Sequence, residues 1–180
     1  MTIRTCLALI TRPAPASPGA DASPGADASL EVLLGFKKTG FGAGRWVGLG
    51  GHIEEGEEPA EAAAREVTEE SSLIVAASAL KKLASLNFIF PARPAWDQTA
   101  EVFVATEFAG AAAESDELIP RWFGIRSLPL DGMWDGARYW LPLVLAGQRV
   151  TADITFADDC ATVAAISPDL LTGAAGAHQT

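Results

Sequence analysis

The stretch from Gly51 to Leu73 reads GHIEEGEEPAEAAAREVTEESSL and carries most of the chain's negative charge. Its window 54–70 holds eight glutamates and one arginine, a net charge of −7 out of −10 for all 180 residues. Pro59 in a first turn, an alanine-rich interior and two closing serines predict a helix over 59–71. On this helix Glu66, Glu69 and Glu70 stand at i, i+3 and i+4, so their carboxylates share one face.

Three carboxylates on one helical face repel one another, and a divalent cation removes that repulsion. Hard oxygen ligands suit Mg²⁺ or Mn²⁺, which bind between carboxylates and the phosphates of a substrate. A run of acidic residues is, however, also typical of a solvated helix surface. The spacing of the charged residues therefore has to decide between a metal site and a plain acidic surface.

That spacing follows a known pattern. The pattern runs through Gly51, then Glu57 after five residues, then after seven more Arg65, Glu66, Val67, Thr68, Glu69 and Glu70, with Leu73 three positions beyond. It resembles the Nudix box, G-x5-E-x7-R-E-U-x-E-E-x-G-U, in which U is aliphatic. Ser72 is the one departure, because the box has a glycine there that ends the helix in a left-handed turn. A serine in that turn costs about 1 kcal/mol and leaves the metal ligands in place.

The resemblance implies an α+β fold in which a mixed β-sheet is sandwiched between helices, an α/β/α arrangement. It also implies hydrolysis of a nucleoside diphosphate linked to another group, with Mg²⁺ as the cofactor and Mn²⁺ as the alternative. The implied metal ligands are the carbonyl of Gly50 and the carboxylates of Glu66, Glu69 and Glu70. One of Glu69 and Glu70 would also activate water, Arg65 would orient a carboxylate, and Glu57 would support the outer shell of the metal.

The likeness extends to the oxidised-purine nucleoside triphosphatases of the MutT-homologue type. The matching segments are 35–38, 40–46, 48–51, 114–117, 122–123, 133–134 and 139–142. Enzymes of that group convert 8-oxo-dGTP and 2-hydroxy-dATP to the monophosphate and pyrophosphate, so such nucleotides are the expected substrates. By the same resemblance Glu114 assists at the metal site, both as a ligand and in catalysis. Phe41 and Trp134 would sandwich the base, and Lys37 and Thr5 would lie at the substrate.

The departures from that group fall where the base is recognised. Val47 stands in place of a hydrogen-bonding asparagine, and Gly136 and Ala137 stand in place of two aspartates. Asp135 remains one position early and is the candidate surrogate for them. Losing such polar groups shifts the preference among bases by several orders of magnitude. The sequence therefore predicts nucleotide hydrolysis and leaves the preferred base open.

Two other functions remain open at this stage. One is hydrolysis of another nucleoside diphosphate compound, such as ADP-ribose or a dinucleoside polyphosphate. The other is a non-catalytic, Nudix-like nucleotide sensor. Sensors of that kind typically lose box carboxylates, whereas this chain keeps all of them.

The remaining sequence predicts a single domain over residues 1–160. Residues 13–29 contain two copies of ASPGAD and are interpreted as a flexible low-complexity insertion between strands at 3–10 and 30–36. Further strands are expected at 80–90, at 101–108, from 121 onward, at 150–156 and at 161–166, with a helix at 139–146. Residues 161–180 are expected to form a terminal strand and a frayed tail.

Charge and cysteine content limit the classes of partner and the cellular location expected for the protein. The acidic balance argues against nucleic acid, because a duplex binder needs clustered Lys and Arg. The apolar run at 6–10 is too short to span a membrane, so no membrane partner is expected. Cys6 and Cys160 have no disulfide or metal-site spacing, which indicates a reducing, cytoplasmic location. We expect a monomer whose partner is a small-molecule nucleotide.

Overall fold

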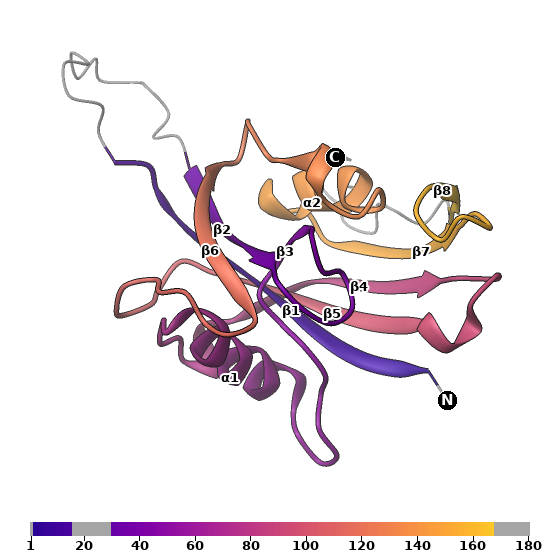
Figure 1. The fold of residues 1–180 in the computed structure, drawn as a ribbon. Helices are drawn as coiled ribbons and strands as arrows, with labels where there is room; N and C mark the ends of the chain where they lie inside the picture. Colours follow the sequence, from indigo (N-terminus) through magenta and orange to yellow (C-terminus); the bar gives the residue numbers. More distant parts are fainter. Residues whose placement is uncertain (1, 16–29, 168–180) are drawn as a thin grey trace, which may run out of the picture.

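The computed structural model describes residues 2–15 and 30–167 (Figure 1). Its elements in chain order are β1 (Ile3–Pro13), β2 (Leu30–Lys37), β3 (Trp46–Val47), α1 (Pro59–Ser71), η1 (Ala77–Ala79), β4 (Lys81–Ile89), η2 (Pro94–Trp96), β5 (Gln98–Ala105), β6 (Leu118–Gly124), η3 (Leu130–Gly132), α2 (Ala137–Leu145), β7 (Val150–Phe156) and β8 (Val163–Ile166). The expected flexible insertion and frayed tail fall mainly on residues 16–29 and 168–180, which lie outside the described residues.

A mixed sheet of strand order β3-β2-β1-β5-β4-β7-β8 forms the centre of the fold, with β6 paired beside β2. β1 runs parallel to β5 over its first part and then turns into an antiparallel pairing with β2. β4 is antiparallel to β5 and parallel to β7. This mixture of parallel and antiparallel pairs confirms the predicted α+β sheet.

The two helices cover opposite faces of the sheet (Figure 1). α1 buries Ala62, Ala63 and Val67 in a core cluster with residues of β1 and β5. α2 buries Trp140 and Leu141 in a second cluster, which includes residues of β4 and β7. Each helix therefore contributes one apolar face to the sheet, as the predicted sandwich requires. No helix in the described part of the chain is long and apolar enough to cross a membrane.

The local expectations hold best where the signal lies within one element. The helix spans 59–71 as predicted, and Ser72 ends it at φ 62°, in the left-handed region. The strand expected from residue 121 instead begins at Leu118, because Leu118 pairs with Lys37 of β2. The strand expected at 101–108 begins at Gln98 and ends at 105, because its partners β1 and β4 set its register from Gln98 onward. Non-local pairing decided both boundaries.

Candidate active site

Glu70 is the buried carboxylate of the acidic helix, with 3% of its side chain exposed. Its Oε2 accepts a hydrogen bond from the Gly50 N–H at 2.7 Å, and its Oε1 accepts one from Lys37 Nζ at 3.3 Å. Burial raises the pKa of Glu70 to about 7, although the Gly50 N–H and Lys37 oppose that shift. Lys37 is also 3.3 Å from a Glu117 oxygen. Burial alone would lower the pKa of Lys37, but its two carboxylate neighbours raise it overall.

Arg65 of α1 forms ion pairs and hydrogen bonds with the loop that precedes this helix. Its Nε and one Nη contact both oxygens of Glu57 at 2.9 and 3.0 Å, a bidentate pair that lowers the pKa of Glu57. Its other Nη donates to Glu66 at 2.9 Å and to Glu69 at 3.1 Å. Burial raises the pKa of Glu66, and the contact with Arg65 offsets part of that shift. Arg65 thus places Glu57, Glu66 and Glu69 around one guanidinium.

Two glycines let this loop approach its neighbours closely. A Cβ on Gly51 would collide with the Glu66 carboxylate. A Cβ on Gly50 would collide with the backbone carbonyl of Cys6 in β1. Glycine is therefore required by backbone contact at Gly50, whereas a side chain at Gly51 would force the Glu66 carboxylate to move. The result is a loop packed between the first strand and the acidic helix.

The donor set fits a divalent cation. Lys37 and Arg65 are the cations that contact the site's five carboxylates, those of Glu57, Glu66, Glu69, Glu70 and Glu117. This excess of negative charge and the hard oxygen ligands suit a metal such as Mg²⁺ or Mn²⁺. Within residues 2–15 and 30–167, no three acidic, His or Cys side chains converge closely enough to hold an ion as they stand. Arg65 donates to oxygens of both Glu66 and Glu69.

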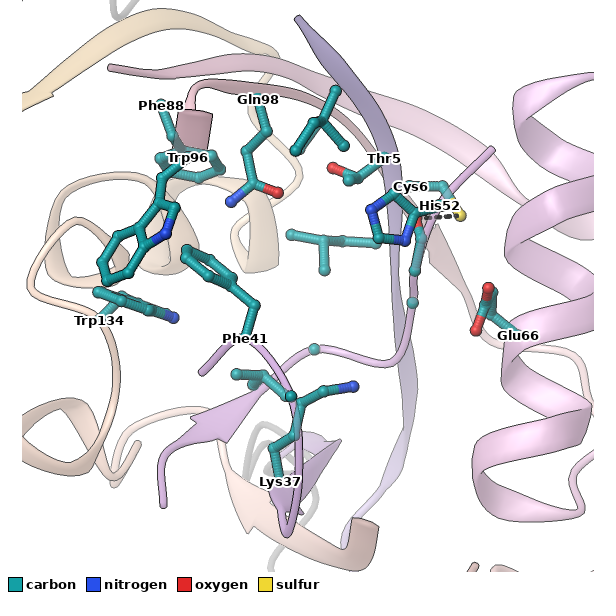
Figure 2. A pocket seen from close by; sticks show the side chains of 18 of the residues that line it. Thr5, Cys6, Lys37, Phe41, His52, Glu66, Phe88, Trp96, Gln98 and Trp134 are labelled. Atoms are coloured by element: carbon teal, nitrogen blue, oxygen red, sulfur yellow. Dashed lines mark hydrogen bonds between the residues drawn. The ribbon is translucent and has the colours of Figure 1, made fainter. Parts of the chain in front are cut away.

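A cavity of about 660 Å³ joins the acidic helix to a cluster of aromatic rings. Glu66, Glu69 and His52 line one end of it, and Phe41, Phe88, Trp96 and Trp134 line the other. Figure 2 shows Glu66 and His52 on one side of this space and the aromatic side chains on the other. One continuous cavity therefore offers an anionic end and a flat, apolar end.

At the aromatic end of the cavity, the rings contact one another and leave no gap for a base. Phe41 and Trp134 stack with ring centroids 5.0 Å apart and planes 18° apart, and Trp96 meets Phe41 edge-on at 5.3 Å. A planar base between two rings needs about 7 Å, twice a van der Waals contact. Phe41 is flanked by Gly40 and Gly42, whose φ values of 72° and 86° suit glycine. Binding of a base between these rings therefore requires Phe41 and Trp134 to move apart.

Most of the residues predicted from the sequence lie around this cavity. Those that line it are Thr5, Lys37, Phe41, Val47, Gly50, Arg65, Glu66, Glu69 and Trp134. Glu57 and Glu70 contact this group through Arg65 and Lys37.

Two predicted residues are not among those lining the cavity. Glu114 is 57% exposed and forms an ion pair with Lys38 at 2.6 Å. Asp135 accepts hydrogen bonds on both oxygens, from Arg138 Nε at 2.7 Å and from the Val163 N–H at 2.9 Å. Neither the loop glutamate chosen from the sequence nor the surrogate aspartate is among the residues that line the cavity, and their expected roles stay predictions.

Sequence reasoning also missed lining residues. Glu117 lies three positions after Glu114, in the segment already noted for its resemblance, and the register of β6 against β2 brings it to Lys37. Trp96 ends η2, and Gln98 begins β5 two residues later. Nothing local in the sequence marks them, because their position depends on the pairing of β5 with β1.

Comparisons with known proteins agree with this geometry. The family model described as NUDIX domain matches residues 26–144, more than half of the chain. The chain is 39% identical over 127 residues to the oxidized purine nucleoside triphosphate hydrolase of Mus musculus, covering 71% of this chain and 80% of that protein. It is 42% identical over 118 residues to the protein of the same name from Danio rerio, covering 66% and 74%.

The fold is also similar to a solved structure. The crystal structure of a mutator MutT protein from Bacillus halodurans superposes with a TM-score of 0.71 at 20% identity, covering 92% of this chain and 96% of the other. The chain therefore belongs to the Nudix family, which confirms the prediction made from the box.

Proposed function

We propose that this Nudix enzyme hydrolyses oxidised purine nucleoside triphosphates, such as 8-oxo-dGTP or 2-hydroxy-dATP, to the monophosphate and pyrophosphate. The observation that carries the proposal is the single cavity with an acidic end and an aromatic end. A triphosphate with its cation suits the first end, and a planar base suits the second. The mouse and zebrafish relatives, both named oxidized purine nucleoside triphosphate hydrolase, support the same substrate class.

The proposal includes Mg²⁺, with Mn²⁺ as the alternative, held by the Gly50 carbonyl and by the carboxylates of Glu66, Glu69 and Glu70. A bound cation neutralises phosphate charge and lowers the pKa of water. Arg65 would keep its bidentate contact with Glu57 while Glu66 and Glu69 would be the carboxylates that hold the metal. We further propose that Glu117, which contacts Lys37, takes the supporting role that the sequence suggested for Glu114.

At the other end of the cavity, Phe41 and Trp134 would take the base between their rings. Val47 and Ala137 line the same cavity with apolar side chains, so they supply no hydrogen bonds to the base edge. Stacking recognises any planar base, because every base has a π-face. Discrimination between bases therefore has to come from other groups in the cavity.

A substrate panel with Mg²⁺ tests the proposal, with products separated by chromatography. The panel contains 8-oxo-dGTP, 2-hydroxy-dATP, the unmodified dNTPs, ADP-ribose and diadenosine tetraphosphate. Preference for an oxidised purine triphosphate, with monophosphate and pyrophosphate as products, is the expected result. Preference for ADP-ribose or the dinucleoside polyphosphate would contradict the proposed substrate while retaining the acidic helix as the hydrolytic site.

Replacing Glu69 with glutamine separates an enzyme from a ligand sensor. The variant should lose turnover by at least about 100-fold, because a carboxylate that binds metal or activates water is gone. Glu61→Gln, on the exposed side of the same helix, is the matched control and should keep its turnover. Unchanged hydrolysis in Glu69→Gln would contradict the assignment of the site.

We also propose that the enzyme acts as a monomer in the cytoplasm. Cys6 and Cys160 are both free and buried, which suits a reducing compartment. Gel filtration at the mass of one chain and localisation of the tagged protein test these two statements. A dimer peak, or the protein in an oxidising compartment, would contradict them.

A further inference from the structure

The aromatic end of the cavity contains few polar side chains. Thr5 lines the cavity beside His52 (Figure 2), and its hydroxyl proton is already engaged, because Thr5 Oγ1 donates to the Thr99 carbonyl at 2.9 Å. Val47 and Ala137 offer no polar atoms. Of the side chains that line the cavity in the described part of the chain, only Gln98 carries an amide. Figure 2 shows this amide projecting into the space beside Phe41.

The backbone of Gln98 is held in place on both sides. In the sheet it stands opposite Ile3 of β1 and Phe88 of β4, and both neighbours also line the cavity. Directly paired residues share a face of a sheet, so the Gln98 side chain is directed into the same space. The preceding Asp97 accepts the Phe90 N–H on its carboxylate at 2.7 Å and the Ile3 N–H on its carbonyl at 3.2 Å. The amide is therefore presented from a rigid strand rather than from a loop.

A side-chain amide presents one donor and one acceptor side by side. The N7 and O6 atoms of guanine are both acceptors. Oxidation at C8 places a proton on N7, so the same edge of 8-oxoguanine carries a donor beside an acceptor. The NH₂ of an amide can then donate to O6 while its oxygen accepts from N7–H. With unmodified guanine, the amide oxygen would instead face the lone pair of N7.

We infer that Gln98 is the specificity-determining residue of the proposed activity, and that its amide distinguishes 8-oxoguanine from guanine by this N7–H and O6 edge. The inference rests on the proposed function. It supplies a recognition group in a chain where Val47, Gly136 and Ala137 replace the asparagine and aspartates of the similar enzymes. A single amide also suffices for the choice, because a mismatched buried pair costs more than a matched one contributes.

Gln98→Met tests the inference, since methionine has a similar length and removes both hydrogen bonds. The ratio of kcat/KM for 8-oxo-dGTP to that for dGTP should fall about 10- to 100-fold, through the KM for 8-oxo-dGTP with kcat retained. Gln98→Glu exchanges the donor for a second acceptor that repels O6, so the ratio should fall at least as far. Gln148→Met, at an exposed position that does not line the cavity, is the matched control.

Calorimetric binding of 8-oxo-dGMP and dGMP in EDTA provides a second readout that needs no turnover. Wild-type protein should bind 8-oxo-dGMP more tightly, and both Gln98 variants should lose that difference while their thermal unfolding stays cooperative. Wild-type preference that persists in both variants would overturn the role of Gln98 and leave the proposed function standing. Absence of any wild-type preference for 8-oxo-dGTP over dGTP would overturn the proposed substrate and this inference together.

Discussion

Replacing Glu70 with glutamine should stabilise the metal-free protein at alkaline pH, although Glu70 is a proposed metal ligand. Burial raises the pKa of Glu70 from 4.5 to about 7 in the folded protein. The folded state therefore binds this proton more tightly than the unfolded chain does. Below pH 4.5 Glu70 is protonated in both states, and its full contribution to the free energy of unfolding is present. That contribution is lost as the pH rises through 7. At 1.36 kcal/mol per pKa unit, the complete loss is about 3 kcal/mol.

Urea unfolding in EDTA, from pH 5 to pH 8, measures this loss. Wild-type protein should lose roughly 2 to 3 kcal/mol relative to Glu70→Gln across that range, because glutamine resembles the protonated acid and keeps its shape. Glu61→Gln, an exposed neutralisation on the same helix, should follow the wild-type curve. Mg²⁺ at pH 8 should restore stability to the wild type and much less to Glu70→Gln. Parallel curves for wild type and Glu70→Gln in EDTA would refute the reasoning.

Ser72→Gly should raise the free energy of unfolding by about 0.5–1 kcal/mol in urea, because Ser72 lies at φ 62°; an unchanged midpoint would contradict this strain. Glu117→Gln should lower kcat/KM at least about tenfold, whereas Glu114→Gln should change it less than about twofold. Steady-state kinetics in which the two effects are reversed would return the role to Glu114. Trp134→Ala should raise KM about tenfold or more through lost stacking. Trp122→Ala, away from the cavity and beside Arg12, should leave KM unchanged; equal effects would argue against a base site at Trp134.

The sequence alone was enough to predict the acidic helix and which of its carboxylates share a face. The positions of Glu66, Glu69 and Glu70 on one face follow from 3.6 residues per turn, which no distant contact has to set. The left-handed end at Ser72 followed from a position in the box where glycine is expected. These features lie within one short segment, so the box also sufficed to predict the family.

The residues at the aromatic end of the cavity could not be predicted in the same way. Gln98 faces the cavity because β5 pairs with β1 and β4 in a particular register. Asp135 is turned away from the cavity because Arg138 and the Val163 N–H donate hydrogen bonds to its two oxygens. Val163 begins β8, near the end of the described chain. Neither outcome leaves a local signal in the sequence.

The same division holds within the acidic site itself. The sequence determined which carboxylates share the helix face, because their spacing along one helix is a local property. Only the tertiary structure decided that Glu70 is buried against Gly50 and Lys37, and that Glu117 rather than Glu114 reaches the cavity. The burial, charge pairing and pKa of a side chain depend on which distant strands and loops contact it. Sheet register and core packing set those tertiary contacts.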